Sequence, residues 1–300
     1  MSTDSTRKIV AGLCNKYENM QLLDNPYKTA PYALNIGIRH AKGNVIIRVD
    51  GHATIARDYL HQCVHYLSQT NAECVGGVIY SVNTTYIGRA IALAMSNSFG
   101  VGNARFRTSG KEGFVDCLAF GAYRREVFDK IGLFDEEFVR CQDDDFNYRL
   151  RQYGGKIFFT PKITAYYYPK PNLKKLWRQY FYYGYWKIRV LQKHLKRMQV
   201  RQFVPPAFVI ALITTGLAGM VSNIFLVLFL ITITSYVLTS FLTSIIISLK
   251  NKTRYLPILP LVFSILHFSY GLGFMVGLFR FAKYWLQENQ QKGAHSLKIS

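Results

Sequence analysis

The feature that most constrains this chain is a run from Phe203 to Leu249 that contains no Lys, Arg, Asp or Glu. The hydrocarbon core of a bilayer is about 30 Å thick, and a helix needs roughly 20 residues to cross it. The 47 positions from 203 to 249 therefore have room for two crossings, with a turn near Ser222 and Asn223. The sequence predicts an integral membrane protein.

The charges beside this run predict its orientation. Residues 151–202 hold 13 Lys and Arg and no acidic residue, in a chain with a formal net charge of +20. Because Lys and Arg mark cytoplasmic flanks, we expect a multi-pass protein of the cell membrane with its polar N-terminal half in the cytoplasm. After two crossings, the basic spacer 250–254 returns to that side. A third apolar stretch, residues 255–279, either spans or is re-entrant, and the charges leave both possibilities open.

The basic band next to the apolar run indicates the partner of this region. Clustered Lys and Arg can bind nucleic acid, but a position against a membrane span favours anionic lipid headgroups. We therefore expect membrane lipids as a partner and no nucleic acid.

Within this band, "LKKLWRQYFYYGYWKIRVLQKHL" places most of its apolar and aromatic residues on one helical face and most basic residues off it. Such a helix, with Trp and Tyr, is predicted to lie in the membrane surface. Gly184 in its middle would allow a break. The alternative is an ordinary packed helix.

The polar half alternates helical patterns with short β-rich runs. Helices are expected over 5–18, 28–41, 56–69 and 86–97 and from near 124 and 144, and strands over 44–50, 75–80, 115–122, 156–160 and 163–168. This alternation predicts an α/β sheet with mainly parallel strands, and ligands on such sheets bind at the carboxyl ends of strands.

The first predicted strand ends in "RVDGHATI". Asp50 follows the apolar run, and His52 comes two positions later. A carboxylate and an imidazole at a strand end can hold Mg²⁺ or Mn²⁺ against a diphosphate. The alternative is a plain Asp-Gly turn with a surface histidine.

A second polar cluster lies in "CQDDDFNYRLR". Adjacent acidic residues suit a helix N-terminus, where the helix dipole favours negative charge, and this is the structural interpretation. The functional interpretation is that one of them, Asp143 or Asp144, is a general base for an acceptor hydroxyl, with Arg149 as a counter-charge one turn later.

Five ordered blocks carry a family resemblance: "STDSTRKIV", "ALNIGIRHAKGNVIIRVDGHA", "FGVGNARFR", "GFVDCLAFGAYRREVFDKIGLFDEEFVRCQDDDFNYRLRQYGGKI" and "RQYFYYGYWK". Together they cover most of residues 2–190 and resemble the inverting family 2 glycosyltransferases, most closely the membrane-bound exopolysaccharide enzymes of the succinoglycan type. The resemblance implies a GT-A, Rossmann-like mixed sheet. The first block matches the segment after the second strand of the family, so the chain is expected to be N-terminally incomplete and to lack the first strand.

The same resemblance assigns residues to roles. Asp50 corresponds to the metal-binding Asp of the Asp-x-Asp motif, with His52 in place of the second Asp. Gln142 and Asp143 align with the Glu-Asp pair of the family, which makes Asp143 the expected base and Asp144 the second choice. The Gln-x-x-Arg-Trp motif appears only as Gln179 followed by two tyrosines. The expected substrate-binding residues are Arg149, Gln179, Tyr182, Tyr183 and Trp186.

The implied activity is transfer of a sugar from a nucleotide-sugar, expected to be UDP-linked, to a lipid-linked saccharide acceptor in exopolysaccharide or cell-surface polysaccharide biosynthesis. The resemblance implies inversion of the sugar and a need for Mn²⁺ or Mg²⁺. A processive polysaccharide synthase and a catalytically inactive membrane adaptor remain the alternatives.

The expected organisation has four parts. Residues 1–170 form the cytoplasmic GT-A domain and residues 171–202 the basic amphipathic helix. Residues 203–281 form a transmembrane region of two to three spans, and residues 282–300 form a polar tail.

Overall fold

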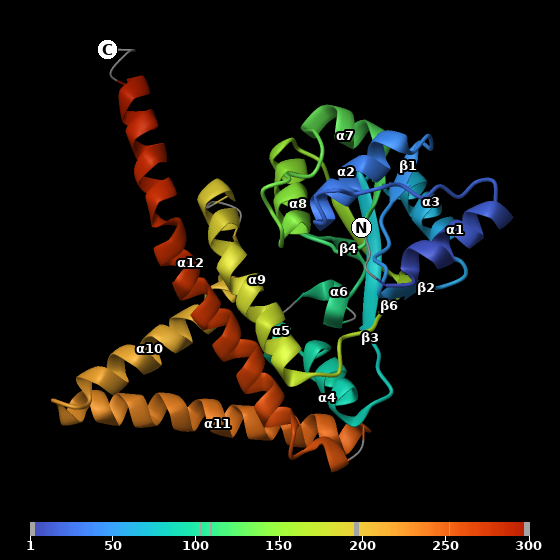
Figure 1. Ribbon diagram of the computed structural model, residues 1–300. Coiled ribbons are helices and arrows are strands. Elements are labelled where there is room, and N and C mark those ends of the chain that lie inside the picture. The colour runs from blue at the N-terminus through green and yellow to red at the C-terminus, as the bar shows by residue number, and fades with distance from the viewer. Residues whose placement is uncertain (1–3, 103, 109, 195–197, 252, 297–300) are drawn as a thin grey trace.

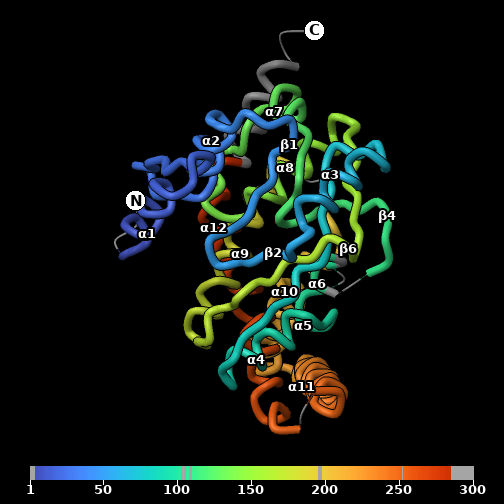
Figure 2. Tube along the Cα trace, turned by 90° about the vertical axis from the view of Figure 1, so that its right-hand side faces the viewer, coloured from blue at the N-terminus to red at the C-terminus, as the bar shows by residue number. Residues whose placement is uncertain are grey.

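The computed structural model describes residues 4–102, 104–108, 110–194, 198–251 and 253–296. It consists of an α/β domain, residues 6–167, and a set of long helices that lead away from it (Figure 1). Seen from the side, α11 is viewed end-on at the opposite end of the molecule from α7 (Figure 2).

The sheet contains β1 (Val45–Ile47), β2 (Ala53–Ile55), β3 (Cys74–Ser81), β4 (Gly113–Phe114), β5 (Ala122–Arg124) and β6 (Ile157–Tyr167). The strand order is β1-β5-β3-β6-β2, and β4 also pairs with β6. Among these pairs only β3 and β6 run parallel. The expectation of mainly parallel strands is therefore wrong, because a helix between two strands need not return the chain in the same direction. The expected mixed α/β sheet is confirmed.

The helices of this domain lie close to the predicted ranges. They are α1 (Thr6–Lys16), α2 (Ala30–His40), α3 (Tyr59–Thr70), α4 (Tyr86–Met95), α7 (Arg125–Ile131) and α8 (Gln142–Gln152), with the short α5 (Ser98–Val101) and α6 (Arg105–Thr108). The predicted strand 115–122 is mostly loop between β4 and β5.

The two predicted strands 156–160 and 163–168 form one strand, β6, which is irregular opposite β3. At the register shift, a Cβ atom on Gly77 would lie 1.8 Å from the carbonyl oxygen of Ile163. Only glycine permits the two backbones to approach this closely, so Gly77 allows the strand to continue through the irregularity.

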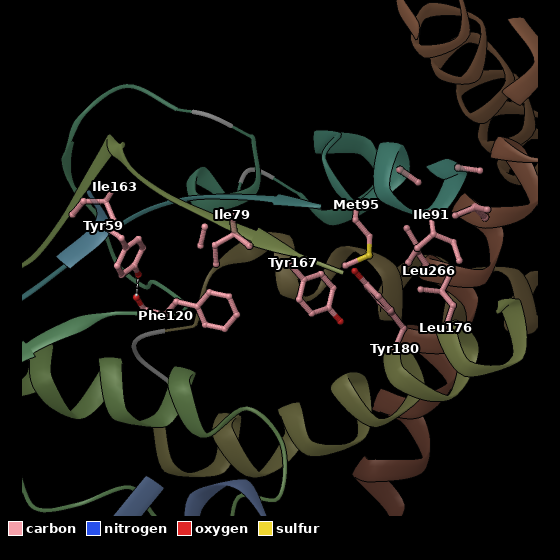
Figure 3. Close-up of a cluster of buried hydrophobic side chains, with 14 of the residues drawn as sticks. Tyr59, Ile79, Ile91, Met95, Phe120, Ile163, Tyr167, Leu176, Tyr180 and Leu266 are labelled. Carbon is pink, nitrogen blue, oxygen red and sulfur yellow. Dashed lines mark hydrogen bonds between the residues drawn. The ribbon is translucent and has the colours of Figure 1, made fainter. Parts of the chain in front are cut away.

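A large hydrophobic core joins the sheet to the C-terminal helices (Figure 3). Tyr59 is almost fully buried, and its hydroxyl donates a 2.7 Å hydrogen bond to the carbonyl oxygen of Phe120. The same core continues through Ile91 and Met95 of α4 to Leu266 of the last helix. The α/β domain and the last helix therefore share one core.

Helix α9 (Leu173–His194) is continuous through Gly184, where the sequence would have allowed a break. A Cβ atom on Gly184 would lie 2.0 Å from the carbonyl oxygen of Tyr270. This glycine provides space for a neighbouring helix instead of bending its own.

The apolar run forms α10 (Val204–Ala218), preceded by the 3-10 turn η2 (Val200–Gln202), and α11 (Asn223–Asn251). The predicted turn near Ser222 and Asn223 is confirmed. After η3 (Thr253–Tyr255), α12 runs from Leu259 to Ser296 and continues past the predicted boundary at residue 281; residues 297–300 of the predicted tail lie outside the described residues. Among the described residues, α11 and the part of α12 from Leu259 to Tyr284 are long and apolar enough to cross a membrane, and α10 is shorter.

Candidate active site

A cleft of about 1550 Å³ lies between the sheet edge, α8, α9 and the C-terminal helices. Of the predicted site residues it is lined by Asp50, His52, Asp143, Asp144, Gln179, Tyr182, Tyr183 and Trp186. The structure thus brings together residues that are more than 130 positions apart in the chain.

Arg48 connects two carboxylates of the cleft: Asp50, which follows β1, and Asp143, which lies at the start of α8. Its Nε donates to Asp50 Oδ1 at 2.8 Å and its Nη2 to Asp50 Oδ2 at 3.2 Å. Its Nη1 forms an ion pair with Asp143 Oδ1. The Arg48 side chain is only 9% exposed, so this is a partly buried cluster of one cation and two anions. Sequence analysis missed Arg48, although a basic residue within the apolar run "VIIRV" was a signal.

Asp143 lies in the first turn of α8. Burial raises the pKa of Asp143 to about 6; Arg48 opposes this effect, and the charges of Asp50 and Asp144 add to it. The carboxyl is therefore mostly ionised at neutral pH and remains basic enough to accept a proton.

Asp144 has different surroundings. It forms an ion pair with Lys187 of α9, and the thiol of Cys117 donates to its Oδ1 at 3.2 Å. Burial by itself would raise the pKa of Asp144, but Lys187 outweighs burial, so the pKa is lowered. Asp144 is therefore a paired anion and a weaker proton acceptor than Asp143.

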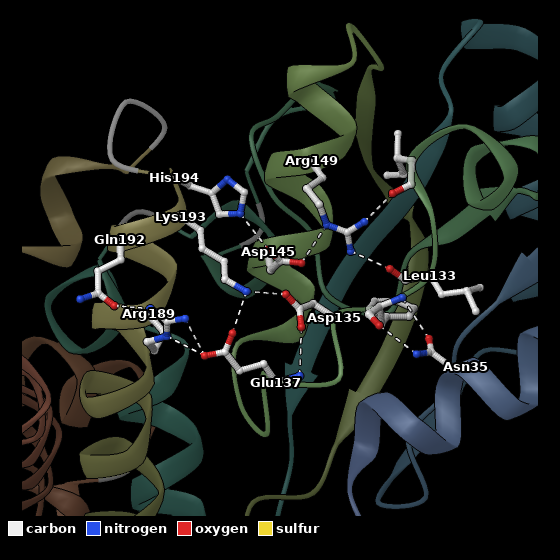
Figure 4. A network of polar contacts seen from close by, with 12 residues as sticks. Asn35, Leu133, Asp135, Glu137, Asp145, Arg149, Arg189, Gln192, Lys193 and His194 are labelled. Atoms are coloured by element: carbon white, nitrogen blue, oxygen red, sulfur yellow. Dashed lines mark hydrogen bonds and ion pairs between the residues drawn. The ribbon is translucent and has the colours of Figure 1, made fainter. Parts of the chain in front are cut away.

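Arg149 does not line the cleft, contrary to the prediction. Figure 4 shows its polar contacts instead. It pairs with Asp145 and donates to the carbonyl oxygens of Ile131 and Leu133 at 2.7 and 2.8 Å. Arg149 lies six positions after Asp143, which turns the two side chains about 120° apart on a helix with 3.6 residues per turn. Arg149 therefore holds the loop after α7 and does not face the cleft.

Four predicted residues of α9 do face the cleft. Gln179, Tyr182, Tyr183 and Trp186 follow the i, i+3, i+4, i+7 spacing of one helical face. Nε2 of Gln179 donates to the hydroxyl of Tyr183 at 2.9 Å. This face forms an aromatic wall with polar groups that can contact a sugar.

His52 and Asp50 are the predicted metal ligands. The rings of His52 and Tyr167 meet edge to face, with centroids 5.1 Å apart, and the Asp50 side chain is 26% exposed. Across the described part of the chain, no group of three His, Cys, Asp or Glu side chains could hold a metal by itself. Mg²⁺ is usually bound by one or two carboxylates together with substrate phosphates, so Asp50 and His52 fit an ion that arrives with a diphosphate.

The far end of the cleft is apolar and lies among α10, α11 and α12, where Phe208, Tyr236 and Leu266 line it. His267 is held there by two hydrogen bonds: Nε2 lies 2.8 Å from the carbonyl oxygen of Phe99 and Nδ1 lies 3.1 Å from the Tyr236 hydroxyl. Because a carbonyl only accepts, Nε2 carries the proton and Nδ1 accepts from Tyr236.

Comparison with known proteins gives three results. Residues 1–132 match the sequence profile of glycosyl transferase family 2. Succinoglycan biosynthesis protein ExoA of Rhizobium meliloti (strain 1021) is 31% identical over 208 residues, which are 69% of this chain and 63% of that protein, so the match spans less than two thirds of this relative. Dolichyl N-acetyl-alpha-D-glucosaminyl phosphate 3-beta-D-2,3-diacetamido-2,3-dideoxy-beta-D-glucuronosyltransferase of Methanococcus voltae is 25% identical over 288 residues, 93% of this chain and 85% of that protein.

Among solved structures, the mannosyltransferase PcManGT of Pyrobaculum calidifontis, in complex with GDP-Man and Mn²⁺, is similar with a TM-score of 0.50. It is 18% identical, and the similarity covers 88% of this chain and 74% of that chain. At this identity the likeness concerns the fold alone, and it confirms the expected GT-A type.

Proposed function

We propose that this chain transfers a sugar from a nucleotide-sugar to a lipid-linked saccharide acceptor in exopolysaccharide or cell-surface polysaccharide biosynthesis. The match of residues 1–132 to the sequence profile of glycosyl transferase family 2 supports this proposal. The names of the two relatives support this: one acts in succinoglycan biosynthesis, and the other acts on a dolichyl-phosphate-linked sugar. A UDP-linked donor is proposed on the family resemblance.

The observation that carries the proposal is the continuity of the cleft. One end holds Asp50 and Asp143, and the other reaches the apolar side chains of Phe208 and Leu266. A lipid-linked saccharide has the same two parts, a polar sugar phosphate and an apolar chain.

The charge of the cleft supports anionic substrates. Eight Lys and Arg side chains line it against three Asp, which leaves an excess of 8 − 3 = +5. All three Asp form ion pairs: Asp50 and Asp143 with Arg48, and Asp144 with Lys187. The remaining basic side chains, among them Arg107 and Arg201, can offset the charge of a donor diphosphate and an acceptor phosphate.

In the proposed reaction, Asp143 takes the proton from an acceptor hydroxyl while that oxygen attacks the anomeric carbon of the donor. The bond from this carbon to the diphosphate breaks on the opposite side, so the anomeric centre is inverted. Asp50 and His52 would hold a divalent ion, Mn²⁺ or Mg²⁺, which offsets the charge of the diphosphate when bound. Asp143 is assigned as the base because Asp144 is already paired with Lys187.

The test is the Asp143→Asn variant, assayed with a UDP-sugar, Mn²⁺ and a lipid-linked saccharide primer. Loss of a general base lowers the rate by about 10²- to 10⁴-fold, so we expect a loss in that range. Asp129→Asn, which changes an exposed acid on α7, is the matched control and is expected to keep full activity. An Asp143→Asn protein with unchanged activity would refute this assignment.

The same experiment separates the alternatives. One sugar added to each primer supports the proposed transfer, whereas long products would identify a processive synthase. Calorimetry with the UDP-sugar and Mn²⁺ on the folded protein tests the adaptor, because an adaptor that has lost the donor site does not bind the nucleotide.

A further inference from the structure

Helix α9 is fixed to the α/β domain by ion pairs along its second half (Figure 4). Lys193 Nζ lies 2.6 Å from Asp135 Oδ2 and 2.8 Å from Glu137 Oε2. The other pairs join Arg189 to Glu137, His194 to Asp145 and Lys187 to Asp144. These contacts place α9 against the acidic surface of the α/β domain.

Helix α12 packs alongside α9 so closely that the two backbones are in contact. A Cβ atom on Gly273 would lie 2.0 Å from the carbonyl oxygen of Phe181, and one on Gly277 would lie 2.6 Å from that of Tyr185. Four positions along α12 correspond to four along α9, so the helices run parallel. Near the end of this contact, Gln192 Nε2 donates to the carbonyl oxygen of Phe281 at 2.9 Å.

The beginning of α12 is also held by the α/β domain. The hydroxyl of Tyr86 donates to the carbonyl oxygen of Arg254 at 2.7 Å, and the rings of Tyr86 and Tyr255 stack at 5.5 Å. Further along, Phe263 packs against Phe99 with ring centroids 5.0 Å apart. The described part of α12 up to Tyr284 therefore contacts the α/β domain or α9 near both ends.

These contacts conflict with a membrane crossing by α12. A parallel neighbour at backbone contact would have to cross with it, but α9 carries charge near both ends: Lys174, Lys175, Arg178, Lys187, Arg189 and Lys193. A charged side chain at the bilayer centre costs about 2.5–3.5 kcal/mol even on the lowest scale, and the acidic partners of α9 belong to the α/β domain. Composition permits α12 to span, but its neighbours do not.

The hairpin of α10 and α11 has the opposite properties. Five consecutive residues of α11, 224–228, are exposed apolar side chains, and consecutive positions cover every face of a helix. At the tip, Met220 and Val221 are 82% and 90% exposed. A protein partner would cover one face, whereas a bilayer covers all of them, so lipid hydrocarbon is the matching environment.

Both ends of this hairpin begin at the α/β domain. Next to the start of α10, Gln202 Nε2 donates to the Tyr148 hydroxyl at 3.2 Å, and α11 leads into the η3 turn that Tyr86 holds. Helix α10 has 15 residues, about 22 Å at 1.5 Å per residue, which is less than the roughly 30 Å of the hydrocarbon core. The tip carries no charged residue that would hold it in water on the far side.

We propose that this chain is monotopic: the α10–α11 hairpin enters the hydrocarbon from the side of the α/β domain and returns, while α12 does not cross. The C-terminal end of α12 then lies on the same side as the α/β domain. This arrangement puts Arg280 and Lys283 on the side of the other basic flanks, as the distribution of Lys and Arg predicts. It does not depend on the proposed transferase activity.

The test uses cysteine reporters in sealed membrane vesicles, labelled with a membrane-impermeant maleimide. Lys130→Cys marks the α/β domain, Ala282→Cys the end of the α9–α12 contact and Val221→Cys the hairpin tip, and all three positions are exposed. The unmodified chain gives the background of its own five cysteines. We expect Ala282→Cys to be labelled from the same side as Lys130→Cys, and Val221→Cys to be labelled from neither side until detergent is added.

Two outcomes would overturn the proposal. Labelling of Ala282→Cys only from the side opposite Lys130→Cys would show that α12 spans, and labelling of Val221→Cys from that side would show that the hairpin crosses completely. If a variant fails to fold, a tag at the C-terminus of the otherwise native chain gives the same answer: a protease added on the side of the α/β domain should remove it. The alternative is that a second copy of the chain covers the hairpin, and liposome flotation tests it. A chain that stays soluble as an oligomer without lipid would contradict insertion.

Discussion

Arg48 and Asp143 are 95 positions apart in the chain and form an ion pair in the cleft, where the same guanidinium also binds Asp50. The pair joins the end of β1 to the start of α8. One cation thereby reduces the repulsion between two carboxylates that the proposed reaction needs close together, one at the metal and one at the acceptor hydroxyl.

Replacing Arg48 should affect both the pKa of Asp143 and stability. In Arg48→Gln the two carboxylates face each other without a counter-charge, so we expect the pKa of Asp143 to rise further. Breaking a buried pair from one side costs about 3–5 kcal/mol in free energy of unfolding, and the partial exposure of both Asp side chains places the expected loss at or below the lower end. Urea titration in mild detergent measures it. Arg57→Gln, an exposed change, is the control, and equal stability of the two variants would contradict this account.

The pH dependence of transfer follows from the pKa of Asp143, about 6. A general base acts in its ionised form, which is lost as the pH falls through the pKa. We expect kcat/KM to be constant above about pH 7 and to fall about tenfold per pH unit below pH 6. The Arg48→Gln variant should move this fall to higher pH. A profile that is flat down to pH 4.5 would rule out Asp143 as the titrating base.

The Lys187–Asp144 pair gives a prediction about stability that does not involve the base. Lys187→Met leaves a partly buried carboxylate unpaired, with an expected loss of about 3 kcal/mol in free energy of unfolding. Lys187→Met combined with Asp144→Leu removes both charges and should recover most of this loss. A double variant that is less stable than the single one would show that the ion pair is not the cause.

The contact between α9 and α12 predicts a contrast between two helical glycines. A Cβ atom on Gly184 would lie 2.0 Å from the carbonyl oxygen of Tyr270, whereas one on Gly12 would meet nothing within 4 Å. We expect Gly184→Ala to lower the free energy of unfolding by about 1–3 kcal/mol through overpacking. Gly12→Ala should leave it unchanged or raise it by up to about 1 kcal/mol. A neutral Gly184→Ala would mean that the helices are not in backbone contact.

Most of the predicted site residues line the cleft, and the sequence pointed to them because they stand out locally. Asp50 follows an apolar run, Asp143 and Asp144 begin a helix, and the cleft-facing residues of α9 share one helical face. The prediction failed for Arg149, whose neighbours along the helix suggested a counter-charge. Its actual partners, the carbonyl groups after α7, depend on how a loop packs against α8.

The sequence by itself determined the family resemblance, the position of the helices and the uncharged hairpin, because these depend on patterns within a few turns or one strand. Strand direction, the Arg48 and Lys187 ion pairs and the course of α12 depend on contacts between distant segments. Hydropathy describes the composition of α12 and does not show that Gly184, Gly273 and Gly277 hold it against a charged helix. Only the tertiary structure shows this contact, since the packing of α12 against α9 joins segments that are about 90 positions apart in the chain.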